Sequence, residues 1–183
     1  MYRPALVLCI AALAMAPMQP TRAEVGAKVQ RMAAMKVDAE TKNFVKNARI
    51  GGNFEVASSK LALDKTQNPD IRAFAERMVT DHTKAGGQLD QTVSGENIMV
   101  EEPSGADKLD KKHQGMLDKL RGANANQFDR IYVQMQQSAH DEAVKLFGKY
   151  SKDGDNAALK SFAQETLPTL QDHKKHINGM NVS

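Results

Sequence analysis

Apolar residues recur at intervals of three and four through most of the chain after residue 38. This is the spacing of one face of an α-helix, and it predicts four long helices. They cover residues 38–66, 69–93, 126–150 and 157–177. Segments that alternate polar with apolar, β-branched residues are lacking, so no strand is predicted. Because the loops are short, we expect the helices to pack as neighbours in an all-α, up-and-down four-helix bundle.

Turn and capping residues mark the ends of these helices. Asn68 can cap the second helix, and Pro69 fits its first turn, where a missing N–H costs no hydrogen bond. Residues 94–104 contain Gly, Asn and Pro without a helical period and form the longest connection. The apolar spacing resumes at Leu109 and stops at Gly122, which predicts a short extra helix before the third long helix.

Residues 1–23 have the pattern of a cleaved secretory signal peptide. Arg3 precedes an apolar run over residues 5–16, and Thr21 and Ala23 place small residues at the two positions that a signal peptidase inspects. The apolar run is shorter than the roughly 20 residues needed to cross a bilayer, and no later segment is apolar enough to do so. We therefore expect an exported protein, periplasmic or secreted, that is cut after Ala23 and has no transmembrane segment in its mature chain.

The mature chain is long enough for one domain with a hydrophobic core. Residues 24–37 space their apolar positions at helical intervals, with Lys and Arg between them, which predicts either a short helix or a mobile leader. The bundle itself is assigned to residues 38–178.

Charge and cysteine content exclude several kinds of site. Removal of the signal takes away two of the 25 basic residues, Arg3 and Arg22, and none of the 22 acidic ones, so the formal net charge falls from +3 to +1. No run of Lys and Arg with interleaved aromatic residues remains, and nucleic-acid binding is not expected. The single cysteine, Cys9, lies in the signal, so we expect no disulfide, thiolate zinc site or cysteine nucleophile in the mature chain.

Four polar residues interrupt the apolar faces, one on each long helix. They are Glu55, His82, His140 and His173. Polar side chains at core positions need partners, and imidazole and carboxylate groups are metal ligands. We therefore predict that these four residues hold one divalent ion in the bundle core, with a donor set that suits Zn, Fe, Cu or Ni. Asp129 and Tyr132 are predicted to form the surrounding shell that orients the imidazoles.

Several longer strings also resemble a known family. They are FVKNARIGGNFEVASSKLAL, NPDIRAFAERMVTDHTKA, NQFDRIYVQMQQSAHDEAVKLF and LKSFAQETLPTLQDHKK. They span roughly residues 38–176, and their most specific motifs are Met-x-x-Asp-His from Met78, Phe-Asp-x-x-Tyr from Phe128 and Leu-Pro-x-x-x-x-His from Leu167. In these strings the chain resembles the exported bacterial proteins known as domain of unknown function 4142. The resemblance implies a ferritin-like four-helix fold and no assigned biochemical function.

A ferritin-like fold raises the question of a di-iron centre, in which two helices each supply a Glu-x-x-His motif. This chain departs from that pattern. The positions three residues before its three core histidines hold Val79, Gln137 and Leu170, none of which is a carboxylate. A di-iron oxidase is therefore not expected.

A second interpretation needs no metal. The histidines and Glu55 can instead form a buried hydrogen-bond network in a periplasmic interaction or envelope-stress protein that binds protein partners in the cell envelope through an exposed apolar face. In either case, imidazoles that gain charge below about pH 6 should destabilise the core. His113 lies beside two lysines and is expected at the rim, outside the site. Because no nucleophile elbow, phosphate loop, HExxH or EF-hand pattern is present, no catalytic residues are assigned.

Overall fold

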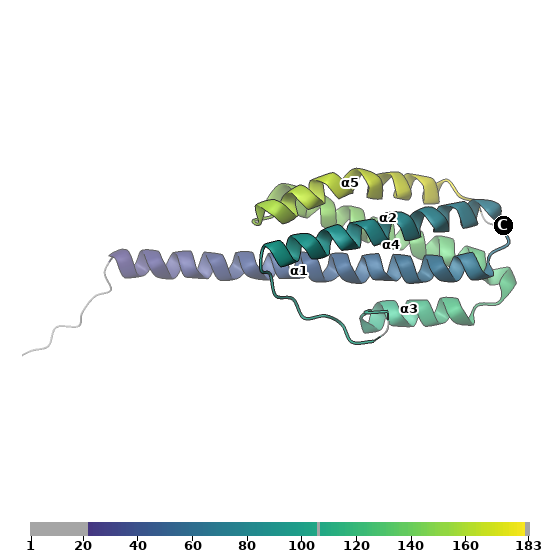
Figure 1. Cartoon of the computed structure of the whole chain (residues 1–183), viewed down its shortest axis with the longest axis horizontal. Coiled ribbons are helices and arrows are strands. Elements are labelled where there is room, and N and C mark those ends of the chain that lie inside the picture. Colours follow the sequence, from purple (N-terminus) through teal and green to yellow (C-terminus); the bar gives the residue numbers. More distant parts are fainter. Residues whose placement is uncertain (1–21, 106, 182–183) are drawn as a thin grey trace, which may run out of the picture. The chain divides into compact units, whose positions relative to one another are not determined.

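The computed structural model describes residues 22–105 and 107–181 of the 183-residue chain (Figure 1). Residues 1–21, which hold most of the predicted signal peptide, lie outside the described residues. The described residues divide into two units between residues 34 and 35, and the candidate site belongs to the second unit. Among the described residues, none of the helices combines the length and the apolar character that crossing a bilayer requires.

The described residues form five helices and no strand, which confirms the all-α prediction. The helices are α1 (Arg22–Lys65), α2 (Pro69–Gly95), α3 (Lys111–Gly122), α4 (Ala125–Asp153) and α5 (Ala157–Asn178). Residues 24–37 are not a separate element, because α1 runs through them and through the first predicted helix. The predicted start of that helix at residue 38 was therefore wrong.

Side-chain caps explain where four of the helices begin. The carboxyl or amide oxygen of the capping residue accepts a backbone N–H of the first turn, which satisfies a donor that has no partner within the helix. Asn68 does this for α2, Asp110 for α3, Asn124 for α4 and Asn156 for α5. The short helix predicted before the third long helix is confirmed as α3.

Consecutive helices of the bundle alternate in direction (Figure 1). Contacts at the helix ends agree with this order. The hydroxyl of Tyr150, near the end of α4, lies 2.8 Å from Oγ1 of Thr41 on α1, while Asn156 before α5 donates to Oε2 of Glu96 just after α2 at 2.7 Å. Because α3 runs back along the bundle between α2 and α4, α2 and α4 run parallel to each other. The prediction that the four long helices alternate was wrong, because it treated the segment between α2 and α4 as a side element rather than as a crossover.

Two apolar clusters fill the interior. One contains Phe54, Phe74, Met78, Tyr132 and Ile177 among its members, and the other contains Phe44, Leu89, Phe147, Phe162 and Leu170 among its members. Each of α1, α2, α4 and α5 contributes to both clusters, so every long helix crosses the boundary between them. The polar residues of the candidate site lie at this boundary.

Candidate metal centre

Three buried histidines from three helices converge in the core. His82 on α2 is 7% exposed, and His140 on α4 and His173 on α5 are fully buried. One ring nitrogen from each residue lies within 4.8 Å of one from each of the other two. The centroids of their rings are 5.5 to 5.8 Å apart. The structure therefore brings the three predicted histidines to one height along the bundle.

The apolar sequence around each histidine sets this common height. On α2, His82 lies between Met78 of one cluster and Leu89 of the other. On α5, His173 lies between Leu170 and Ile177, which again belong to different clusters. Because the two clusters form at fixed places along the bundle, burying both on every helix brings the residues between them together.

Glu55 approaches the histidines from α1 and is itself 2% exposed. Its Oε2 lies 3.0 Å from Nδ1 of His82, and its Oε1 lies 3.3 Å from Nδ1 of His140. The same nitrogen of His140 donates a hydrogen bond of 2.8 Å to the backbone carbonyl of Gln136. Glu55 therefore contacts Nδ1 of two imidazoles, and it is not a member of the group whose possible ligand atoms lie within 4.8 Å of one another.

Asp81 holds the third imidazole. Nε2 of His173 donates to Oδ2 of Asp81 at 2.9 Å, and Nε of Arg77 reaches the same oxygen at 3.4 Å. Arg77 is fixed in turn by Asp172 of α5, through a contact of 2.7 Å. Asp81 was not among the predicted site residues, because it lies about 100° around α2 from His82 and off the apolar face. The signal that points to it is its place beside His82 in the Met-x-x-Asp-His motif.

In each of the three histidines, the ring nitrogen that does not contact Glu55, Gln136 or Asp81 is buried without a hydrogen-bond partner. These atoms are Nε2 of His82, Nε2 of His140 and Nδ1 of His173. In a neutral imidazole, one nitrogen carries the proton and the other carries a lone pair. When the N–H is held by an outer carboxylate or carbonyl, the lone pair is free to bind a metal, and metal-binding histidines usually have this arrangement.

Burial favours the neutral, metal-binding form of these histidines. It lowers the pKa of His140 to about 4. It also lowers the pKa of His82 well below the ordinary value, and the neighbouring His140 and His173 lower the pKa of His82 further. Burial also lowers the pKa of His173, although its hydrogen bond to Asp81 opposes the shift. The pKa of Glu55 is raised to about 8, because burial penalises the carboxylate.

The two residues predicted to surround the site lie elsewhere. The hydroxyl of Tyr132 is 2.8 Å from Oγ of Ser59, and Oδ1 of Asp129 is buried without a partner among the described residues. Tyr132 precedes His140 by eight residues, or about 12 Å along the helix, and Asp129 lies further away still. Although all three residues lie on the buried side of α4, this separation keeps Tyr132 and Asp129 away from the triad. His113 lies outside the triad, as expected, with Nδ1 2.7 Å from Asp110.

The surroundings of the triad differ on its two sides. Phe74 covers one side, with its ring centroid 6.2 Å from that of His140 and 6.3 Å from that of His173. On another side lies a cavity of about 560 Å³, whose lining includes Glu55 and His82. The arrangement combines inward-facing imidazoles with open space beside them, which is the form of a metal site that can take an additional ligand.

Comparison with known families places the chain in one family. Residues 26–180 match the family described as domain of unknown function (DUF4142), and the chain belongs to it. No curated protein and no solved structure matches the chain. The membership confirms the family resemblance seen in the sequence and assigns no activity.

Proposed function

We propose that this protein binds a single divalent transition-metal ion through His82, His140 and His173. The observation that supports the proposal is that each buried ring has one nitrogen held by the protein, while the opposite nitrogen has no partner. A buried polar atom without a partner costs free energy, of the order of 1–3 kcal/mol for an ordinary group. Three such atoms, one on each of three histidines that converge in the core, are explained together if an ion binds them.

The distances suit a first-row ion after a small adjustment. Zn–N bonds of about 2.0–2.1 Å place tetrahedral nitrogens roughly 3.3 Å apart. Here the nitrogens lie within 4.8 Å of one another, so each has to move inward by less than about 1 Å. Imidazole donors suit Zn, Cu, Fe and Ni, and three of them leave a fourth position for another ligand.

Glu55 and Asp81 act in this proposal as the groups that orient the ligands. Carboxylates that accept the outer N–H of a metal-bound histidine fix its ring orientation and increase its basicity. Glu55 has this position toward His82, and Asp81 has it toward His173. This differs from the four-ligand site expected from the sequence, in which Glu55 bound the ion directly.

The connection between the helices supports a ferritin-like bundle. Ferritin-like folds have one long crossover between their two helix pairs, and the segment from residue 96 through α3 forms such a crossover here (Figure 1). The proposed centre nevertheless differs from a di-iron site, in which a carboxylate three residues before the histidine, on the same helix, binds the metal. Here each carboxylate that contacts a histidine of the triad comes from a different helix than that histidine. We therefore propose a mononuclear centre in a ferritin-like bundle.

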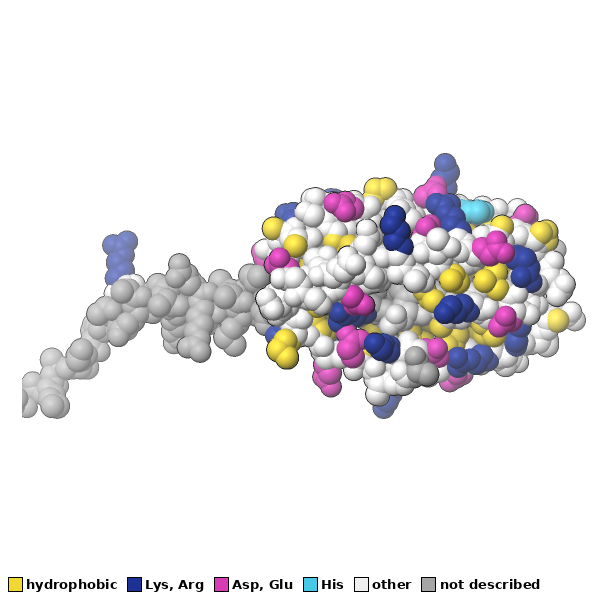
Figure 2. Space-filling model, in the orientation of Figure 1, with side chains coloured by type: hydrophobic (Ala, Val, Ile, Leu, Met, Phe, Trp, Pro, Cys, Tyr) yellow, Lys and Arg dark blue, Asp and Glu magenta, His cyan; other side chains and the backbone are white. Residues whose placement is uncertain are grey.

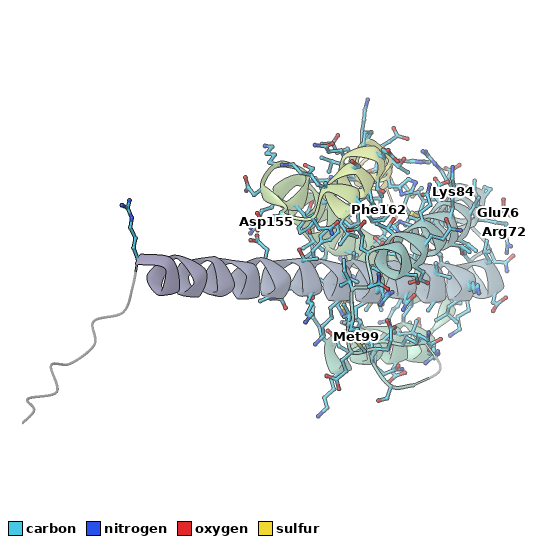
Figure 3. The ribbon with its side chains drawn as sticks, turned by 60° about the vertical axis from the view of Figure 1, so that its left-hand side comes forward. Arg72, Glu76, Lys84, Met99, Asp155 and Phe162 are labelled. Carbon is cyan, nitrogen blue, oxygen red and sulfur yellow. The ribbon has the colours of Figure 1, made fainter. Side chains whose placement is uncertain are left out.

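The metal-free alternative, a structural hydrogen-bond network in an interaction protein, has less support. Such a network should satisfy its own members, whereas Oε1 of Glu55 and one nitrogen of each histidine have no hydrogen-bond partner. Among the described side chains, Met99 is the one large apolar residue that is exposed (Figure 3). Acidic and basic side chains are interspersed on the face shown in Figure 2. Neither observation favours a broad apolar docking face.

We also propose that the protein acts outside the cytoplasm. The support is the charged start, the apolar run and the small residues at the predicted cut after Ala23. Amino-terminal sequencing of the protein from a periplasmic or culture fraction tests this proposal, and a mature chain that begins at Glu24 is expected. A chain that retains Met1 in that fraction would contradict it.

Titration of chelator-treated protein with Co²⁺ tests the metal centre. We expect one ion per chain and visible absorption bands typical of a four-coordinate Co²⁺ ion, because imidazoles from three helices impose a low coordination number. The triple variant of His82, His140 and His173 to Ala is expected to show neither. A stoichiometry near zero in the wild type would contradict the proposal.

A further inference from the structure

A cavity of about 560 Å³ lies beside the histidine triad. It is lined by residues of α1, α2, α4 and α5, and Glu55 and His82 lie at its inner end. Its size falls within the range of small-molecule binding sites in proteins, which is about 300–1,000 Å³. A bundle core is normally packed without such space, so the side chains that create it need an explanation.

Small residues on three helices create the space. They are Gly51 and Gly52 on α1, Gly86 on α2, and Ala139 and Ala143 on α4. A Cβ atom added at any of the three glycines would meet no heavy atom within 4 Å apart from its chain neighbours and the nearby backbone of its own helix. No close backbone approach therefore requires these glycines. In a helix each of them costs up to about 1 kcal/mol relative to alanine, and what they provide here is open volume.

The wall beyond these residues is apolar. Leu89 of α2, Phe147 of α4, and Phe162 and Leu170 of α5 line the cavity, and all four are buried. Phe162 lies among the helices in Figure 3. This wall suits the apolar part of a ligand.

The inner end of the cavity is polar and has unused bonding capacity. Oε1 of Glu55 is buried without a hydrogen-bond partner, and Nε2 of His82, the atom assigned to the ion, belongs to the other residue at this end of the lining. His82 is 7% exposed and Glu55 is 2% exposed. A ligand in the cavity therefore meets polar atoms at one end and apolar side chains along its length.

The rim of the cavity carries charges that are paired with one another. Arg49 of α1 forms ion pairs with Asp90 of α2, at 2.8 Å, and with Glu102 of the crossover segment. All three residues line the cavity. The lining also holds Lys108 and Glu142, so outside the inner end its two basic residues face three acidic ones. The rim therefore supplies little attraction for an anion, and selectivity must come from the apolar wall and the inner end.

We propose that this cavity binds a small monocarboxylate with an apolar body, whose carboxylate oxygen completes the coordination of the ion held by the three histidines. The inference rests on the proposed metal centre. Three neutral imidazoles bring no negative charge into direct contact with a divalent ion, which favours an anionic oxygen donor in the remaining position. The apolar wall binds the hydrocarbon part of the same molecule by removing it from water.

Octanoate added to Co²⁺-loaded protein tests the inference. We expect a saturable change of the visible bands with one octanoate per chain, and at least tenfold weaker binding of acetate, which lacks the apolar body. Gly52→Leu and Gly86→Leu place side chains into the cavity and should weaken octanoate binding at least tenfold. Both should leave the Co²⁺ stoichiometry unchanged, because a Cβ atom at either position would meet no side chain of the triad within 4 Å. Gly87→Leu is the matched control, since Gly87 has equally open surroundings and does not line the cavity.

The outcomes separate the two proposals. Loss of octanoate binding in the cavity variants, with Co²⁺ uptake intact and Gly87→Leu unchanged, supports the cavity as the site. If wild-type protein takes up Co²⁺ and its spectrum does not respond to octanoate, or responds equally in the cavity variants, the cavity inference is wrong and the metal centre stands. Protein that takes up no Co²⁺ contradicts the metal centre and, with it, the carboxylate site.

Discussion

Nε2 of His173 on α5 donates a hydrogen bond of 2.9 Å to Oδ2 of Asp81 on α2. Asp81 is the sequence neighbour of His82, so a single turn of α2 supplies one imidazole of the triad and the carboxylate that holds another. This bond uses Nε2 of His173 and leaves Nδ1 buried without a hydrogen-bond partner. The orientation of His173 therefore depends on how α2 and α5 pack.

Asp81→Asn should weaken metal binding tenfold to a hundredfold and leave the fold intact. The amide is a weaker acceptor than the carboxylate, and it loosens the hold on the outer nitrogen of His173. Competition with a chelator of known affinity measures the effect. Asp172→Asn is the control, because Asp172 contacts Arg77 and not the imidazole, and its affinity should remain within about twofold of wild type. Equal affinities of the two variants would show that Asp81 does not orient the ligand.

The sequence was sufficient to find the histidines of the site but not the groups that hold them. Each histidine continues an apolar stripe at helical intervals, so its burial could be predicted from its own helix. Asp81 lies off the stripe of α2 and meets His173 only because α2 and α5 pack together. That contact is tertiary and has no periodic signal. Glu55 was found for the same reason as the histidines, but its position behind two of the rings required the structure.

The metal-free protein should be most stable between about pH 6 and pH 7. The folded-state pKa values of the three histidines lie below their ordinary value of 6.5, so the unfolded chain binds more protons below that pH, and stability is lost as the pH falls. The folded-state pKa of Glu55 is raised to about 8, so stability is also lost as the pH rises toward 8. Each group changes the free energy of unfolding by at most about 1.4 kcal/mol per pH unit.

Chemical denaturation in the presence of a chelator, from pH 4.5 to pH 8.5, measures this profile. A free energy of unfolding that is flat across the range would contradict the burial of these groups. Between pH 4.5 and 6.5 the shift of Glu55 acts in the opposite direction to those of the histidines, and the three histidines together should dominate.

Glu55→Gln should remove the alkaline part of this profile. Glutamine does not titrate, so the loss of stability between pH 6.5 and pH 8 should disappear, while the loss in acid, which comes from the histidines, should remain. The same denaturation series on the variant measures both parts. Retention of the full alkaline loss would assign it to a group other than Glu55.

Tyr132→Phe should lower the free energy of unfolding by about 1 kcal/mol and leave metal binding unchanged. The hydroxyl of Tyr132 bonds to Ser59, 2.8 Å away, rather than to a histidine, so its loss costs one buried hydrogen bond. Tyr150→Phe is a matched variant, because its hydroxyl is likewise 2.8 Å from a buried hydroxyl, that of Thr41. Denaturation and metal titration of both variants check the prediction. A metal affinity that is tenfold lower in Tyr132→Phe, and unchanged in Tyr150→Phe, would show that Tyr132 does contribute to the metal site.

The fold was predictable to a similar extent. Caps such as Asn68 and the apolar periods gave the helices and most of their boundaries, because both are local features. The parallel order of α2 and α4 was not predicted, since the direction of a helix depends on where the preceding connection ends. The short helix α3 returns the chain along the bundle. Its apolar spacing predicts a helix but not the direction in which that helix runs.

Elemental analysis of protein purified from a periplasmic fraction, without chelators or a histidine tag, tests the central claim most directly. The comparison is with the His82→Ala/His173→Ala double variant and with His113→Ala, which removes a histidine outside the triad. The metal centre predicts close to one transition-metal ion per chain in the wild type and in His113→Ala, and almost none in the folded double variant. Equal metal content in all three proteins, or none in any of them, would contradict it and would favour a structural role for these residues.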